Sequence, residues 1–172
     1  FNWYPKPMSI RQVNCTYVPE EDRVMFRFST GTEELQEYRL WITRAVLAQL
    51  LRHTHVLSVE SVKGNMNVQQ AQEVAEFKQE ALAQNVTYTQ FESAPKLPLG
   101  AEPTLVKAVS AKLETVKDSQ KVAALVFQLA RGQNLTLRMN DDLLGKLQLL
   151  FKKMNESAGW ALAIDSQVKV LH

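Results

Sequence analysis

The sequence predicts an α+β protein of two similar halves, each an antiparallel β-meander followed by a helix (βββα). A surface helix is inserted between the halves, and a strand is expected at the C-terminus. Stretches of alternating apolar and polar residues, typical of half-buried strands, come in groups of three, and an amphipathic helix follows each group. The junction Leu40-Trp41-Ile42-Thr43 matches Leu137-Arg138-Met139-Asn140 at an offset of 97 residues. We therefore expect a duplication with a pseudo-two-fold axis; the alternative is convergence of two similar units.

The first half is expected to span residues 1–56. Strands are predicted over residues 8–18, 23–29 and 35–42, with a turn between the first two that begins at Pro19. The second strand has Val24, Phe26 and Phe28 on one side, the period of two of a half-buried strand. Thr43 is the expected N-cap of an amphipathic helix that ends near residue 53.

The second half is expected to span residues 106–172, with strands over residues 106–116, 122–130 and 135–139. Asn140 is the expected cap of a strongly amphipathic helix, Gly159 its terminator, and residues 160–171 a last strand. The strand over residues 122–130 is apolar on both sides. One layer of helices covers only one side of a sheet, so the other half, the tail strand or another subunit must cover the second side.

Residues 57–105 are expected to link the halves. Residues 57–63 read as a possible strand, and residues 67–85 as a helix whose weak apolar stripe places it on the surface. Four Pro and Gly residues between positions 95 and 103 indicate an irregular connection.

Composition bounds the class of protein and its compartment. The 172 residues are 45% hydrophobic and 22% charged, a globular mixture, and no apolar run is long enough to cross a membrane. Cys15 is the single cysteine, which excludes an internal disulfide and favours a reducing compartment. Asn-X-Ser/Thr motifs point the other way, but most lie where turns or helix ends are expected. We expect a cytoplasmic protein that does not bind membranes.

No sequence motif indicates an enzyme or a metal site. His53 and His55 are the only pair at metal-like spacing, and two ligands do not complete a site. Cys15 is expected on the core face of its strand, where it acts as a small hydrophobic residue. Nucleophile elbows, P-loops and dinucleotide-binding motifs do not occur in the sequence. We therefore expect no catalytic residue, no metal and no cofactor. A site assembled from residues that are distant in the sequence would not form a motif.

The outward face of the first half is the candidate binding surface. If the apolar positions of its strands face the helix, Met25, Arg27, Arg39 and Trp41 face away on neighbouring strands. Arginines beside a tryptophan suit flat or anionic partners through stacking and cation–π contact. The alternative is that the inserted helix or the second half covers Trp41, with arginine stems packed over it.

The leading functional hypothesis is a non-catalytic binding or assembly module that holds a protein partner or its own copy. The runner-up is a single-stranded nucleic-acid binder that uses the same face, together with ten basic and five acidic residues between positions 96 and 153. By element order alone, the repeated meander-plus-helix units resemble the Whirly and PUR families of single-stranded nucleic-acid binders. Against this, Glu33, Glu34 and Glu37 form an acidic cluster, expected at a solvated edge, that would repel phosphates.

Overall fold

A computed structural model describes residues 10–31, 34–85, 90–115 and 121–163 of the chain. The elements follow the order βββααβββα. The strands are β1 (Ile10–Val18), β2 (Arg23–Thr30), β3 (Gln36–Ile42), β4 (Thr104–Thr115), β5 (Lys121–Leu129) and β6 (Asn134–Met139). The helices are α1 (Arg44–Lys63), α2 (Val68–Asn85) and α3 (Asp141–Ala158). The α+β class is confirmed, and the six strands lie close to where the alternating pattern predicted them.

All six strands form one mixed sheet whose spatial order is the chain order, β1 to β6. Every neighbouring pair is antiparallel except β3 and β4, which run parallel and meet only where Leu40 pairs with Thr104 and Trp41 with Leu105. The third strand of the first group thus joins the first strand of the second group.

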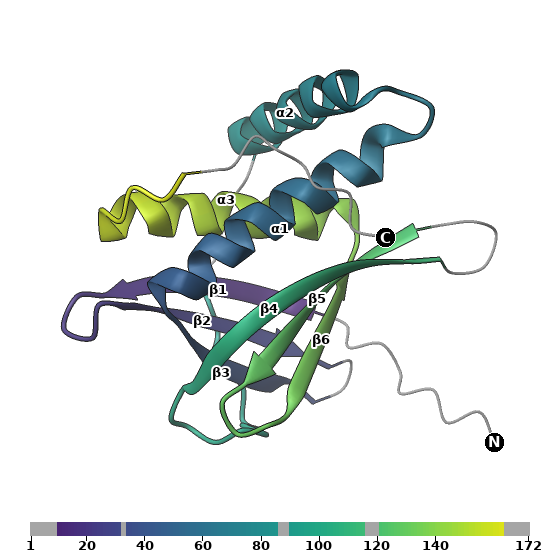
Figure 1. Ribbon diagram of the computed structural model, residues 1–172. Coiled ribbons are helices and arrows are strands. Elements are labelled where there is room, and N and C mark those ends of the chain that lie inside the picture. Colours follow the sequence, from purple (N-terminus) through teal and green to yellow (C-terminus); the bar gives the residue numbers. More distant parts are fainter. Residues whose placement is uncertain (1–9, 32–33, 86–89, 116–120, 164–172) are drawn as a thin grey trace, which may run out of the picture.

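The three helices lie on one side of the sheet, with α1 and α3 against it and α2 outermost (Figure 1). Helix α1 packs mainly over β4, and α3 packs over β1, so each helix covers strands of the other group. The aromatic rings follow the same arrangement: Phe26 of β2 lies 6.1 Å from Phe127 of β5 and 5.7 Å from Phe151 of α3, between ring centroids. The two groups of strands therefore share one hydrophobic core.

The predicted helix caps are confirmed. The Thr43 hydroxyl accepts a hydrogen bond from the Val46 N–H (3.3 Å), and the Asn140 side chain accepts one from the Leu143 N–H (2.9 Å). Each bond satisfies a backbone donor that the first turn of a helix leaves unpaired. Gly159 ends α3 at φ 65°, in the left-handed conformation that glycine adopts without steric cost.

Helix α1 does not end near residue 53, and residues 57–63 are not a strand. The helix continues to Lys63, with Val56, Leu57 and Val59 buried. Val59 contacts Ala71 and Ala75 of α2. Since these two are the buried residues of α2, this helix lies on the surface, as expected. The β-branched residues of this stretch favour a strand locally. The stretch is helical because it packs between α2 and the rest of the core.

The strand expected over residues 160–171 is absent from the described part of the tail, residues 160–163; the remainder lies outside the described residues. Trp160 is buried against the first hairpin. Its indole N–H donates to Asp22 (3.1 Å), and its ring meets that of Tyr17 edge-on at 5.7 Å. Tyr17 also donates to Asp22 (2.5 Å), so the end of α3 is tied to the β1–β2 turn.

The second side of β5 is partly covered by side chains of its neighbouring strands. Arg138 of β6 pairs with Glu114 of β4 at 2.6 Å, and the two meet across β5. Ala124, in register with Arg138, is fully buried, while Val122 and Val126 stay half-buried. Among the described residues, no helix is long and apolar enough to cross a membrane.

Candidate binding surface on the outward face

The outward face of the sheet, opposite the helices, carries a short apolar row where β3 meets β4. Met25 pairs with Trp41, and Trp41 pairs with Leu105, so three apolar side chains lie side by side on three strands. Met25 and Trp41 are half-buried, and Leu105 is 36% exposed. We call Met25, Trp41 and Leu105 the apolar row. It joins residues from both groups of strands.

Trp41 is partly covered by an arginine that the sequence did not nominate. The guanidinium carbon of Arg23 lies 4.6 Å from the centre of the Trp41 ring, a cation–π contact. Arg23 also pairs with Glu21 at 2.6 Å. The predicted packing of an arginine over Trp41 is therefore present, but Trp41 remains half-buried rather than closed off.

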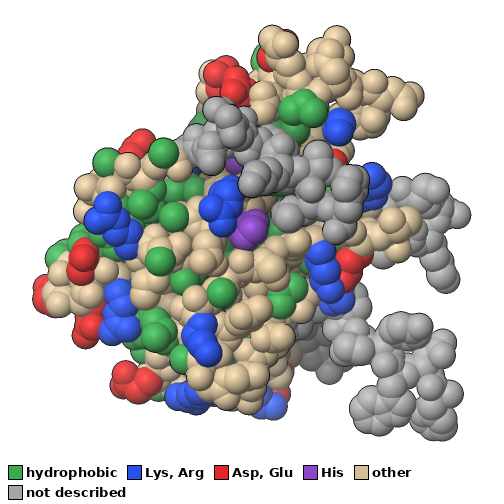
Figure 2. All heavy atoms as spheres, in the orientation of Figure 1, with side chains coloured by type: hydrophobic (Ala, Val, Ile, Leu, Met, Phe, Trp, Pro, Cys, Tyr) green, Lys and Arg blue, Asp and Glu red, His purple; other side chains and the backbone are tan. Residues whose placement is uncertain are grey.

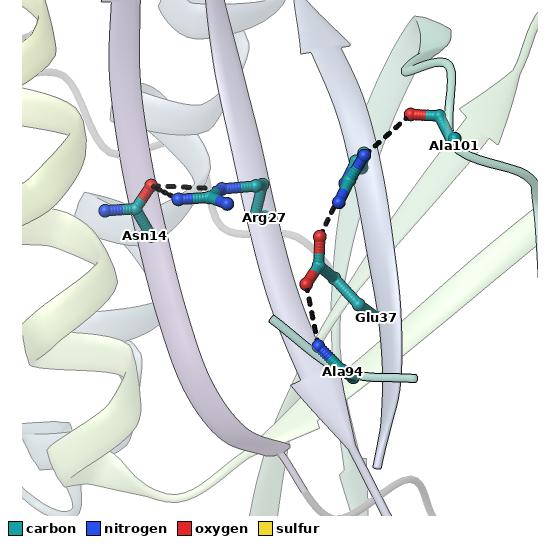
Figure 3. A network of polar contacts seen from close by, with 6 residues as sticks. Asn14, Arg27, Glu37, Ala94 and Ala101 are labelled. Atoms are coloured by element: carbon teal, nitrogen blue, oxygen red, sulfur yellow. Dashed lines mark hydrogen bonds and ion pairs between the residues drawn. The ribbon is translucent and has the colours of Figure 1, made fainter. Parts of the chain in front are cut away.

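Arg27 lies on the same face and turns away from the apolar row. Its guanidinium donates to the Asn14 side chain on β1 (3.2 and 3.4 Å; Figure 3). The same group stacks 4.5 Å from the centre of the Phe91 ring. Phe91 belongs to the connecting segment, residues 90–103, which leads from α2 toward β4. This segment, rather than the inserted helix, supplies the cover on this part of the sheet.

Arg39 and Glu37 fix the connecting segment to β3. Arg39 pairs with Glu37 at 2.5 Å and donates to the Ala101 carbonyl at 3.0 Å (Figure 3). Glu37 also accepts from the Ala94 N–H at 3.2 Å, and its own N–H donates to the Lys96 carbonyl at 2.8 Å. The Glu37 side chain is fully buried. The expectation that Glu37 stands at a solvated edge is therefore wrong, because the segment covers it.

The four predicted residues share one face, where Met25 pairs with Trp41 and Arg27 with Arg39. Met25 and Trp41 are neighbours in the apolar row, whereas Arg27 and Arg39 are each engaged by the connecting segment. The period of two that placed Met25 outward also placed Arg23 outward, so the sequence contained that signal. Leu105 could not have been found, because its position depends on the parallel pairing of β3 with β4.

Charge on the face seen in Figure 2 is dispersed: Lys and Arg side chains of the described residues are spread over it, several of them beside Asp or Glu side chains. Arg23, Arg27 and Arg39 of the outward face all have partners within the chain. A phosphate backbone would have to compete with those partners.

The remaining candidate groups occupy structural positions. His53 Nε2 lies 2.9 Å from the Val109 carbonyl, where it ties α1 to β4, and burial lowers the pKa of this histidine. Cys15 is buried in the core, and burial raises the pKa of its thiol. Among the described residues, no three His, Cys, Asp or Glu side chains are grouped to hold a metal ion.

Comparison with models of known protein families, with curated proteins and with solved structures returns no match to this chain.

Proposed function

We propose that the chain is a non-catalytic binding or assembly module that holds a protein partner or a second copy of itself through the apolar row. The observation that carries this proposal is the contrast within the outward face. The arginines are engaged inside the chain, while Met25, Trp41 and Leu105 remain half-buried or exposed. Tryptophan, methionine and arginine are enriched where proteins contact one another, and tryptophan and arginine anchor many such interfaces.

Single-stranded nucleic-acid binding is the second candidate, because Trp41 with Arg23 offers a ring and a cation of the kind that stack on bases. We favour protein contact over nucleic-acid binding, because phosphate groups would have to bind guanidinium groups that already have partners within the chain. The two proposals predict different salt dependence, because each phosphate that is neutralised releases counterions.

Trp41→Ala separates these functions. For a protein contact, sedimentation velocity should show loss of self-association, or partner capture should fall, and a labelled oligonucleotide should not bind at any salt concentration. For a nucleic-acid platform, the same change should weaken oligonucleotide binding by about 1–3 kcal/mol. If Trp41→Ala lowers only the melting temperature, Trp41 is a packing residue and neither function holds at this site.

Duplication of a βββα unit is the evolutionary part of the proposal. Its support is the repeated junction: Trp41 and Arg138 each stand two residues before a helix cap, and both caps bond the N–H three residues later. Related chains with more similar halves would strengthen it, whereas a related chain with a different strand order in one half would contradict it.

A cytoplasmic location completes the proposal. The buried, unpaired Cys15 suits a reducing compartment. Fractionation of cells that express the chain tests this point.

A further inference from the structure

An open hollow of about 470 Å³ lies between the second half of α2 and the first turn of α3, and the end of α1 lines its third side. Each helix contributes one apolar side chain to its lining: Val62, Leu82 and Leu144. Leu144 is buried, and the other two are half-buried. We call this space the helix hollow. It lies on the helical side of the sheet, opposite the apolar row (Figure 1).

Phe77 stands at the rim of the helix hollow and is the most exposed large apolar side chain of the described residues. It is 72% exposed, whereas Met66 and Val68 are 38% exposed. A single apolar side chain on a surface is ordinary, but an exposed ring beside an apolar hollow is typical of a contact site. A protruding ring and a hollow that suits such a ring thus lie in one patch.

Helix α2 is poorly covered within a single chain. Of its 18 residues, Ala71 and Ala75 are the buried ones. Most of the stability of a helix in a protein comes from packing of its apolar side, and not from helix propensity. Phe77 and Ala81 are exposed on the side of α2 that lines the hollow. A partner that covers them would therefore stabilise the helix as well as the contact.

Gly145 allows α2 and α3 to approach closely at the hollow. A Cβ atom at this position would lie 2.5 Å from Leu82 Cδ2, so the missing side chain lets Leu82 reach the backbone of α3. Glycine is unfavourable inside a helix, and this contact offsets that cost. The Gln79 side chain also donates to the Gly145 carbonyl at 3.4 Å. The hollow is therefore formed within the single chain, before any partner binds.

The rim carries both signs of charge, and neither is neutralised by an ion pair among the described residues. Lys78 lies on the α2 side, and Asp141 and Asp142 lie on the α3 side. All three are exposed, and none pairs with a described residue. The dipole of α3 stabilises the two carboxylates in its first turn, where they remain open to a cation from outside.

The features of this patch complement one another, which indicates the kind of partner. A two-fold axis places one surface patch opposite the same patch of a second copy. The ring of each copy then meets the hollow of the other, and each lysine meets two carboxylates. A different protein would have to supply a ring, a hollow and a charge pattern that this chain already has.

We propose that a second copy of the chain docks here about a two-fold axis. Each copy inserts Phe77 into the other's helix hollow and places Lys78 beside the other's Asp141 and Asp142. Such a contact closes on itself, so it gives a dimer and not a filament. The inference goes beyond the proposed function, because the apolar row lies on the other side of the sheet and stays free. The dimer would carry two apolar rows.

Sedimentation velocity of the intact chain at low ionic strength tests the dimer. We expect a monomer–dimer equilibrium in the wild type. Phe77→Ser should raise the dissociation constant about tenfold or more, because it removes the aromatic anchor of the contact. Val68→Ser is the matched control, on the same helix but outside the hollow, and should leave the constant unchanged. Far-UV circular dichroism checks that each variant keeps its helices.

Charge reversal tests the two-fold arrangement. Lys78→Glu puts like charges opposite each other at both contacts, and so does a variant that combines Asp141→Lys with Asp142→Lys. Each variant alone should raise the dissociation constant about tenfold, because like charges disfavour a contact. An equimolar mixture of the two should recover association, since the heterodimer pairs opposite charges at both contacts. Added salt should weaken the wild-type dimer.

A wild-type chain that stays monomeric at its highest soluble concentration would overturn the inference. A dimer that Phe77→Ser leaves intact, or a mixture of the charge variants that does not associate, would overturn it too. Trp41→Ala should leave this dimer unchanged. Self-association that is lost with Trp41→Ala and kept with Phe77→Ser would overturn the inference while supporting the proposed function.

Discussion

Trp41 and Arg138 occupy equivalent positions in the two groups of strands, but one side chain is aromatic and the other is charged. Each lies on the outward face of the last strand of its group, two residues before the helix cap. Arg138 reaches across β5 to Glu114, and their ion pair covers Ala124. Trp41 lies between Met25 and Leu105 and is partly covered by Arg23. The second group therefore satisfies its outward position internally, while the first keeps apolar surface.

The comparison teaches where binding should be sought. The charge pair on the second group lies over Ala124, and its charges are already satisfied by each other. A half-buried tryptophan next to an exposed leucine loses water on contact, which favours association. The outward face thus differs in chemistry between the two groups of strands.

The largest effect should come from the core that both groups share. Leu147 of α3 is fully buried, so Leu147→Ala should lower the free energy of unfolding by about 2–5 kcal/mol through lost burial and a cavity. Glu76→Ala on exposed α2 should cost roughly 0.5 kcal/mol or less. Chemical denaturation measures both; similar losses would show that the shared core is wrongly assigned.

The next effect sharpens the comparison on the first group. Glu37→Ala removes a fully buried carboxylate and leaves Arg39 and the Ala94 N–H without their acceptor. We expect a loss of about 1–3 kcal/mol, with faster amide exchange across residues 90–103. Glu34→Ala is the control, since Glu34 and Lys96 are both exposed, and it should cost at most a few tenths of a kcal/mol, roughly. Equal costs would mean that the segment is not fixed through Glu37.

The smallest effect concerns the ion pair on the second group. Arg138, and to a lesser extent Lys112, hold the pKa of Glu114 below its ordinary value. The resulting stabilisation is present above the ordinary pKa of about 4.3 and is lost as the pH falls through the lowered pKa. Because Arg138 is more than a third exposed, Glu114→Gln should cost less than about 1 kcal/mol at pH 7. The difference between wild type and variant should shrink below pH 4.

A wild-type advantage that persists in acid would mean that the Glu114 side chain stabilises the sheet by packing and not by its charge. Urea denaturation at several pH values, together with Glu156→Gln at an exposed position of α3 as control, measures this directly.

Local sequence patterns predicted much of the fold. Alternation placed the six strands, and Thr43, Asn140 and Gly159 marked helix ends through their own backbone chemistry. What the sequence could not show depends on contacts between distant segments. Val59, for example, favours a strand locally and is helical because Ala71 and Ala75 of α2 pack against it.

The candidate site likewise has features that local patterns predicted and features that depend on distant contacts. The outward direction of Met25, Arg27, Arg39 and Trp41 followed from a period of two. The burial of Glu37 did not, because residues 90–103 cover it from more than fifty positions away in the chain. The apolar row likewise needs the parallel contact between β3 and β4, which no local pattern encodes.

Site-specific photocrosslinking in living cells tests the central claim most directly, that the apolar row contacts a protein. The crosslinker p-benzoylphenylalanine would replace Met25 in one chain and, as a matched control, Val122 in another, an outward half-buried position on β5. The account predicts protein adducts, with a second copy or another chain, from position 25 and few or none from position 122. Adducts that nuclease removes, or equal yields from the two positions, would contradict it.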